Sequence, residues 1–217
     1  MSWHQLVSKL WLAFALVGCA RAQGPAPESA APSATPPALH RERARARLRA
    51  VIRDQSFLEH LPESVRATTL SEPFAGRMVI SYMVDDHGAA RGAQASDLTE
   101  AGVTREALRA VIEWNLARAM RGPLSCTSHL VSEPAHRDYY ESSRLLLDKQ
   151  WSDLAQAGKV VVAVPSNDTL FVACNPTPEI LQKLAALVQN TYPRATGPVS
   201  PALLTWTKDG WRELSEP

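Results

Sequence analysis

Residues 160–174 read VVVAVPSNDTLFVAC, and this stretch decides the fold class. Val160–Val164 is a run of apolar, mostly β-branched residues, which predicts a strand buried on both faces. Leu170–Cys174 is a second such run, and four turn-favouring residues, Pro165–Asp168, separate the two. A loop this short joins antiparallel neighbours, so the stretch predicts a hairpin at the centre of an antiparallel sheet.

Helices and further strands are predicted on both sides of this hairpin. Apolar spacing predicts helices over residues 104–121, 150–156 and from Thr177 onward, with Thr104 and Thr177 as caps. Alternating residues predict a strand at 77–84 with a weaker returning strand at 93–95, and a closing hairpin at 203–214. Residues 139–147 are apolar enough to be buried, as either strand or helix. The pattern predicts a single α+β domain over residues 39–217, mainly an antiparallel sheet with packed helices.

Composition narrows the classes of function. The chain has 217 residues, 45% of them hydrophobic, which suits one globular domain with its own core. Three cysteines are too few for a disulfide scaffold. Basic and acidic residues balance once Lys9 is set aside, so the net charge favours binding neither to nucleic acid nor to anionic lipid, and no nucleic-acid partner is expected. The sequence has neither a phosphate-binding loop nor a dinucleotide fingerprint, and we expect no cofactor.

The amino terminus carries an export signal. Leu10–Gly18 is uncharged, too short to span a bilayer, and typical of a secretory signal peptide over residues 1–18. It ends in LVGC at residues 16–19, which resembles a bacterial lipobox and predicts a lipid on Cys19. The alternative is ordinary cleavage after ARA at residues 20–22, giving a secreted or soluble periplasmic protein. We prefer the lipobox, because it falls at the end of the apolar run.

A spacer follows the predicted lipidation site. The spacer after Cys19, Ala20–Ala38, has 19 residues. It includes five prolines and seven alanines and lacks large apolar side chains, so it cannot join a core. We therefore interpret residues 19–38 as a disordered tether between a lipid anchor and the domain. Ala20 stands where an aspartate would favour retention in the inner membrane, so an outer-membrane anchor on the periplasmic face is expected.

The segment that opens the domain is strongly basic. Residues 41–53 hold six arginines, and Leu48, Val51 and Ile52 would share one face of a helix. A basic amphipathic helix is typical of membrane or nucleic-acid binding, or of a solvated helix with one buried stripe. We prefer the solvated helix, because the lipid already reaches the membrane and nucleic acid is not expected outside the cytoplasm.

Three segments together resemble a known family. They read SDLTEAGVTREALRAVIEWNL at 96–116, YYESSRLLLDKQWSDLAQAGKVVVAVPSNDTLFVAC at 139–174 and PVSPALLTWTKDGW at 198–211. They resemble the uncharacterised YtpQ-like family of bacterial proteins over about Met78–Trp211. That family has no established activity, so the resemblance implies no catalytic residues. The chain departs from the family in its export signal and Pro-rich leader.

Two sets of residues suggest chemistry without a supporting motif. Ser142 and Ser143 with His129, His136 and Asp168 would supply a Ser-His-Asp set, but no nucleophile elbow is present. Zinc ligands could come from four residues: Cys126, His129, His136 and Asp138. No C-x-x-C or H-E-x-x-H spacing accompanies them, so we assign no metal site and no catalytic residue. Arg144, Asn167 and Asp168 join His129, His136 and Asp138 as weak ligand or binding candidates.

Cys126 and Cys174 are the cysteines that remain if Cys19 carries lipid. An exported protein meets an oxidising compartment, which favours a disulfide between them. The alternatives are that Cys174 packs as a small apolar residue and that Cys126 is a free thiol or a metal ligand.

The sequence thus favours a non-catalytic envelope lipoprotein that binds a protein, a peptide or a cell-wall component. The alternative is a hydrolase-like or metal-dependent enzyme with a site at loops 125–138 and 165–168.

Overall fold

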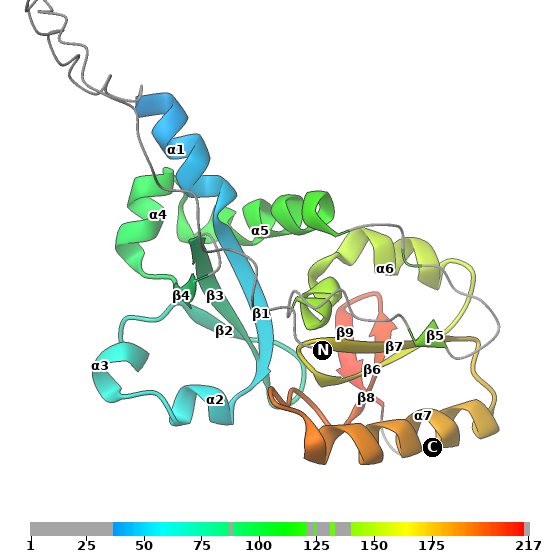
Figure 1. Ribbon diagram of the computed structural model, residues 1–217. Coiled ribbons are helices and arrows are strands. Elements are labelled where there is room, and N and C mark those ends of the chain that lie inside the picture. Colours follow the sequence, from blue (N-terminus) through cyan, green and yellow to red (C-terminus); the bar gives the residue numbers. More distant parts are fainter. Residues whose placement is uncertain (1–36, 87–88, 121–123, 125–130, 133–139, 215–217) are drawn as a thin grey trace, which may run out of the picture. The chain divides into compact units, whose positions relative to one another are not determined.

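The computed structural model describes residues 37–86, 89–120, 124, 131–132 and 140–214 (Figure 1). The predicted signal peptide, the tether before Pro37 and five candidate residues lie outside these ranges: Cys19, Cys126, His129, His136 and Asp138. The chain from Thr35 to Pro217 is one compact unit. Helices and two antiparallel sheets build it, so the fold is α+β in a single domain, as the sequence predicts.

The predicted hairpin lies at the centre of the second sheet, whose strand order is β5-β7-β6-β8-β9. β6 (Val160–Ser166) pairs antiparallel with β7 (Thr169–Cys174), and β5 (Val131–Ser132) borders β7. The closing hairpin of β8 (Leu203–Thr207) and β9 (Gly210–Glu213) continues the sheet beyond β6. The turn after β6 has two residues and not the expected four, because pairing continues to Ser166 opposite Thr169.

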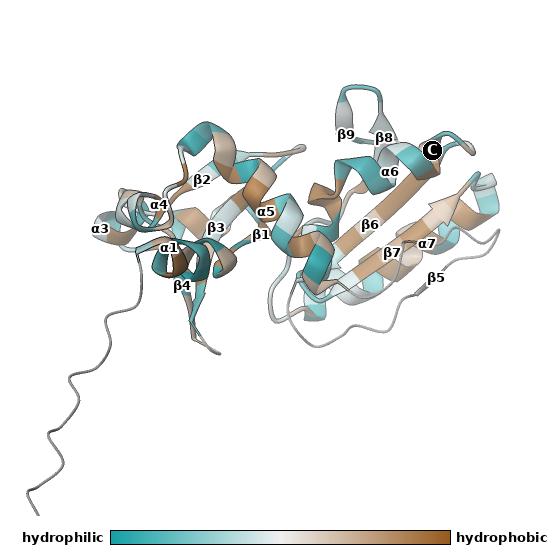
Figure 2. Cartoon of the chain, turned by 90° about the horizontal axis from the view of Figure 1, so that it is seen from above, coloured by the Kyte–Doolittle hydropathy of each residue, from teal (hydrophilic) through white to brown (hydrophobic). Residues whose placement is uncertain are grey.

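Both faces of β6 are buried, which confirms the prediction from its continuous apolar run. Val160, Val162 and Val164 pack into the larger core cluster. Val161 and Ala163 pack into a second cluster with α7 (Pro178–Thr191). Figure 2 shows β6 and β7 as hydrophobic along most of their length. Thr177 caps α7 as predicted, since its hydroxyl accepts a hydrogen bond from the Ile180 N–H at 3.4 Å.

The first sheet is built around β3 (Met78–Asp86). β1 (Leu48–Asp54) pairs with one edge of β3, while β2 (Ser71–Pro73) and β4 (Ala89–Gly92) pair with the other. The alternating residues of β3 are buried as predicted: Met78, Ile80, Tyr82 and Val84. β4 lies before the returning strand expected at 93–95, because pairing begins directly after the turn, with Ala89 opposite Asp86.

The basic segment at 41–53 is not one helix, and that prediction is wrong. α1 (Pro37–Ala46) leads directly into β1 (Figure 1). Leu48, Ala50 and Ile52 are at most 1% exposed, at the period of two that a strand requires. The arginine- and alanine-rich run extends to Ala50, but β1 also contains the β-branched Val51 and Ile52 and is buried against β3.

Two helices follow β4. α4 (Ala95–Ala101), which the sequence analysis did not predict, begins with a capping box in which Asp97 accepts a hydrogen bond from the Gln94 N–H at 2.8 Å. α5 (Arg105–Ala119) begins at Thr104 as predicted, since the Thr104 hydroxyl accepts from the Ala107 N–H at 3.3 Å. Three of its buried residues, Leu108, Ile112 and Leu116, are four residues apart and form one apolar stripe.

The segment left open between strand and helix is a 3₁₀ helix, η1 (Glu141–Leu146), and α6 (Asp148–Ala155) follows it. The Trp151 and Trp211 indole N–H groups donate to the carbonyls of Arg144 and Leu145, at 2.7 Å and 2.9 Å. These bonds fix η1 in the core. The remaining helices are short: α2 (Ser56–Glu59), α3 (Glu63–Arg66) and η2 (Tyr192–Arg194).

Candidate functional site

A groove of about 790 Å³ lies between α1 and the carboxyl-terminal half of α5. Its charged and aromatic lining consists of six residues: Arg41, Glu42, Arg45, Arg49, Trp114 and Arg118. Four guanidinium groups therefore face one carboxylate. A second cavity, of about 500 Å³, lies beside Trp206 with Lys159 and Lys208. The first is the larger and has the stronger concentration of charge, so we take it as the candidate site.

Helical spacing places the arginines of α1 in the groove. Arg41 and Arg45 are four residues apart, so they share one face of α1, and Arg49 follows at the start of β1. Ala44 is the buried residue of α1 and holds the helix against the domain. Arg47 does not line the groove, since it pairs with Asp86 and Glu100 at 3.1 Å each. Arg47 is thus engaged in ion pairs within the domain, whereas the arginines of the groove face solvent and could bind a ligand.

The groove arginines have no carboxylate partner among the described residues. Arg45 donates to the Gly102 carbonyl at 3.1 Å, and Arg49 donates to the carbonyls of Ala46 and Leu48 at 2.6 Å and 3.0 Å. A carbonyl orients a guanidinium but does not neutralise its charge. Within the part of the chain that the structure describes, Arg41 and Arg118 donate no side-chain hydrogen bond. The groove therefore keeps an excess of positive charge, which favours an anionic ligand.

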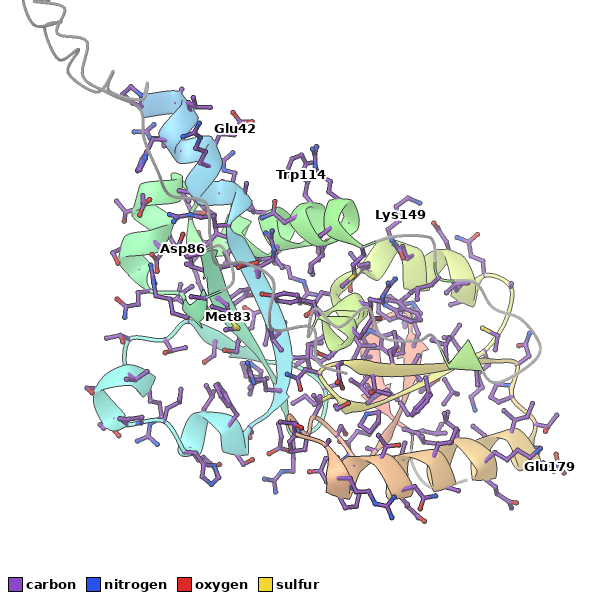
Figure 3. The ribbon with its side chains drawn as sticks, viewed as in Figure 1. Glu42, Met83, Asp86, Trp114, Lys149 and Glu179 are labelled. Carbon is purple, nitrogen blue, oxygen red and sulfur yellow. The ribbon has the colours of Figure 1, made fainter. Side chains whose placement is uncertain are left out.

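Trp114 gives the groove an exposed aromatic side chain. It is 57% exposed, the highest value among the exposed large hydrophobic side chains. Figure 3 shows Trp114 on the outer side of α5, pointing away from the sheet. The Arg118 guanidinium lies over its ring, 4.4 Å from the centroid. The arrangement combines a cation with an amphipathic ring, as in sites that bind anionic or planar groups at a water interface.

The floor of the groove is fixed by Asn115. This residue is buried, and its side-chain amide donates to the carbonyls of Arg45 and Leu48 at 2.9 Å each. These bonds join α5 to the junction of α1 and β1. The two walls of the groove are therefore held together by the fold, and no ligand is needed to bring them together.

The structure assigns Ser142 and Ser143 to the fold. Both are fully buried, and their hydroxyls donate to the Ile52 and Ala50 carbonyls of β1, at 3.3 Å and 2.6 Å. These serines therefore join η1 to the outer edge of the first sheet. A hydroxyl held in this way is not placed as a nucleophile. The histidines of the predicted set lie outside the described ranges.

Arg144 is also part of the core and not of a surface site. Its guanidinium Nε donates to Glu141 at 2.8 Å, and both side chains are at most 5% exposed. Breaking one side of such a buried pair is costly, because the other charge stays buried. The sequence analysis missed this ion pair, although glutamate and arginine three residues apart are the usual signal for one on a helix.

Asn167 and Asp168 are the two turn residues between β6 and β7. The Asp168 carboxylate accepts from the Ser166 and Thr169 hydroxyls at 2.5 Å and 3.1 Å, so its bonds stay within the turn. The Asn167 backbone carbonyl accepts from the Ser142 N–H at 3.1 Å, which brings the turn next to η1. Neither cavity described above is lined by Arg144 or Asp168.

The cysteine and metal predictions fall mostly outside the described residues. Cys174 is disulfide-bonded, but Cys19 and Cys126 both lie outside the described ranges. The same holds for His129, His136 and Asp138, so the zinc set and the enzyme site at loops 125–138 and 165–168 stay predictions. Within the described ranges, no three His, Cys, Asp or Glu side chains are grouped as metal ligands.

Sequence reasoning missed the groove, because α1 and α5 are far apart in the chain. One signal was available. Trp114 lies outside the apolar stripe of its helix, and a large aromatic residue there is exposed unless a partner covers it. The net charge of the chain gave no indication of the groove, since acidic residues elsewhere balance the arginines of α1.

Comparison with family models, curated proteins and solved structures found no match for this chain. The YtpQ-like resemblance therefore stays a prediction. Among the helices described, none has the length and apolar character needed to cross a membrane.

Proposed function

We propose that the protein is an exported lipoprotein of the cell envelope whose α+β domain is a non-catalytic binding module. Cys19 carries the lipid, and residues 20–36 connect it to α1. The anchor lies in the outer membrane on the periplasmic face, with a secreted or soluble periplasmic form as the alternative. The lipobox at the end of the apolar run and the Pro-rich spacer support the anchor.

The groove between α1 and α5 is the observation that carries the binding role. It gathers four arginines without carboxylate partners among the described residues around the exposed Trp114. Arginines without carboxylate partners beside an exposed tryptophan do not stabilise a protein core. They do supply the charge and the hydrogen-bond donors that recognition of an anionic group requires. The ligand classes that the sequence favours, an envelope protein, a peptide or a cell-wall component, each include anionic members.

Fatty-acid labelling in cells tests the anchor. Cells that express the chain are grown with radioactive palmitate, and the protein is isolated and counted. Wild type is expected to be labelled and Cys19→Ser to lose the label. The exposed Ser152→Ala is the control, because it leaves both the lipobox and the disulfide of Cys174 unchanged. Equal labelling of wild type and Cys19→Ser would contradict the proposal.

A further inference from the structure

We propose that the α1–α5 groove binds anionic phospholipid headgroups of the membrane that carries the anchor, and so docks the domain on the bilayer. This inference rests on the proposed function and names the ligand of its groove.

The groove has the chemistry that phosphodiester headgroups require. A guanidinium is planar, stays charged at all physiological pH values and donates two parallel hydrogen bonds to a phosphate. Arg41 and Arg118 stand on opposite walls, and neither hydrogen-bonds through its side chain to a described residue. A phosphate between them would therefore displace no hydrogen-bond partner among the described residues. Glu42 is the one acidic side chain in the lining, and the net charge remains positive.

Exposed hydrophobic side chains accompany these charges. Four large hydrophobic residues of the described chain are exposed, and two of them belong to the walls' helices: Leu39 of α1, 40% exposed, and Trp114 of α5, 57% exposed. Tryptophan is enriched at the level of the headgroups, where its ring is apolar and its N–H is hydrated. Arginine and exposed tryptophan on neighbouring helices are typical of surfaces that lie on membranes.

The position of α1 in the chain favours a lipid over another anionic ligand. α1 begins at Pro37, 18 residues after Cys19. In the extended conformation of Pro-rich chains, at about 3.1 Å per residue, this spacer reaches at most roughly 55 Å. α1 is thus the element with the shortest connection to the anchor. A short tether gives the groove a high effective concentration of headgroups, so even a weak site is occupied.

Vesicle sedimentation tests the inference independently of the anchor. The full chain carrying Cys19→Ser is made without lipid and mixed with vesicles of phosphatidylcholine, or of phosphatidylcholine and phosphatidylglycerol in equal parts. We expect sedimentation with the anionic vesicles well above the phosphatidylcholine baseline. Sedimentation that is equal for both kinds of vesicle, or absent from both, would overturn the proposal. The labelling of Cys19 is decided separately, so the two proposals can fail separately.

A charge-matched pair of variants tests the groove itself. Arg41→Gln with Arg118→Gln should lower the partition constant on the order of 30-fold, since each cation near an anionic surface contributes roughly fivefold. Lys183→Gln with Arg194→Gln removes the same charge from exposed positions on α7 and η2, and should change it far less. Circular dichroism checks that both double variants fold. The Trp114→Ala variant tests the groove a second time, because it removes the exposed ring and should also lower the partition constant. Equal losses in the two double variants would show attraction by net charge alone and overturn the proposal.

Salt competition separates a headgroup site from a site for free phosphate. Sodium chloride and sodium phosphate are compared at equal ionic strength. Both salts are expected to release the protein by screening, and phosphate moderately more, because it also competes for the guanidinium groups of the groove. Complete release by phosphate at an ionic strength at which chloride leaves the protein bound would show a site filled by free phosphate and overturn the choice of a bilayer as ligand.

Discussion

At the scale of single residues, side-chain donors close the outer edge of β1. The Arg47 carbonyl accepts from the Asp85 N–H of β3, so the even-numbered carbonyls of β1 face the other way. Three of the four are capped by a side chain from another element: Asn115 caps Leu48, Ser143 caps Ala50, and Ser142 caps Ile52. An edge strand whose carbonyls are already bonded cannot pair with another chain.

Ser143→Ala tests this role. The change removes the hydroxyl that donates to the Ala50 carbonyl at 2.6 Å and leaves that carbonyl buried without a donor. We expect a loss of about 1–3 kcal/mol in the free energy of unfolding, measured by urea denaturation. The exposed Ser152→Ala is the matched control and should stay within about 0.5 kcal/mol of wild type. A loss for Ser143→Ala no larger than the control's would contradict the assignment.

At the scale of elements, α4 depends on the Asp97 carboxylate. Asp97 accepts two hydrogen bonds from Arg91, at 2.8 Å and 2.5 Å, and one from the Gln94 N–H. Asp97→Asn should lower the free energy of unfolding by about 1–2 kcal/mol at neutral pH, because the charge and one of the two acceptor oxygens are lost together. Asp153→Asn, in an exposed ion pair with Lys149, is the control and should cost less than about 1 kcal/mol.

The effect of Asp97 should depend on pH. The hydrogen bonds from Arg91 lower the pKa of Asp97 below its ordinary value. The pKa of an aspartate in the unfolded chain is about 3.9. A carboxyl group whose pKa is lower in the folded state makes its full contribution to the free energy of unfolding when the pH is above that unfolded value. That contribution is lost as the pH falls through the folded pKa. The difference between wild type and Asp97→Asn should therefore be constant near pH 7 and shrink in strong acid; a difference that does not shrink would contradict this account.

Most of the elements could be predicted because their signals are local. β6 and β7 follow from continuous apolar runs, and the starts of α5 and α7 follow from threonine caps. β1 could not be predicted correctly, because its arginine and alanine residues favour a helix locally. Its pairing with β3, which buries it as a strand, is not visible in the local sequence. The groove also could not be predicted, since its two walls come from segments far apart in the chain, which core packing and the bonds of Asn115 bring together.

At the scale of the whole molecule, the proposed lipid on Cys19 determines which cysteine remains to pair with Cys174. Cys174 is disulfide-bonded, and we predict Cys126 as its partner. A Cys19 whose sulfur carries lipid cannot form a disulfide. The predicted loop of roughly 50 residues is worth on the order of 4 kcal/mol in the chain-entropy model.

A thiol count on the mature protein tests this pairing. Denatured, unreduced protein should react with no equivalent of a maleimide reagent, and reduced protein with two. One reactive thiol before reduction would show that Cys126 is free. Peptide mapping without reduction would then identify the partner of Cys174.

Tryptophan quenching in vesicles shows whether the α1–α5 groove faces the membrane, as we propose. The lipidated protein is placed in vesicles whose phosphatidylglycerol is brominated near the headgroup. Trp3 and Trp11 lie in the proposed signal peptide, Trp151 and Trp211 are buried and Trp206 is half-buried, so Trp114 is the most exposed indole of the proposed mature chain. We predict that brominated phosphatidylglycerol quenches the fluorescence of wild type. This quenching should be largely lost in Trp114→Phe, and it should be absent in vesicles whose only lipid is brominated phosphatidylcholine. Equal quenching in wild type and Trp114→Phe, or no quenching in either, would contradict the account.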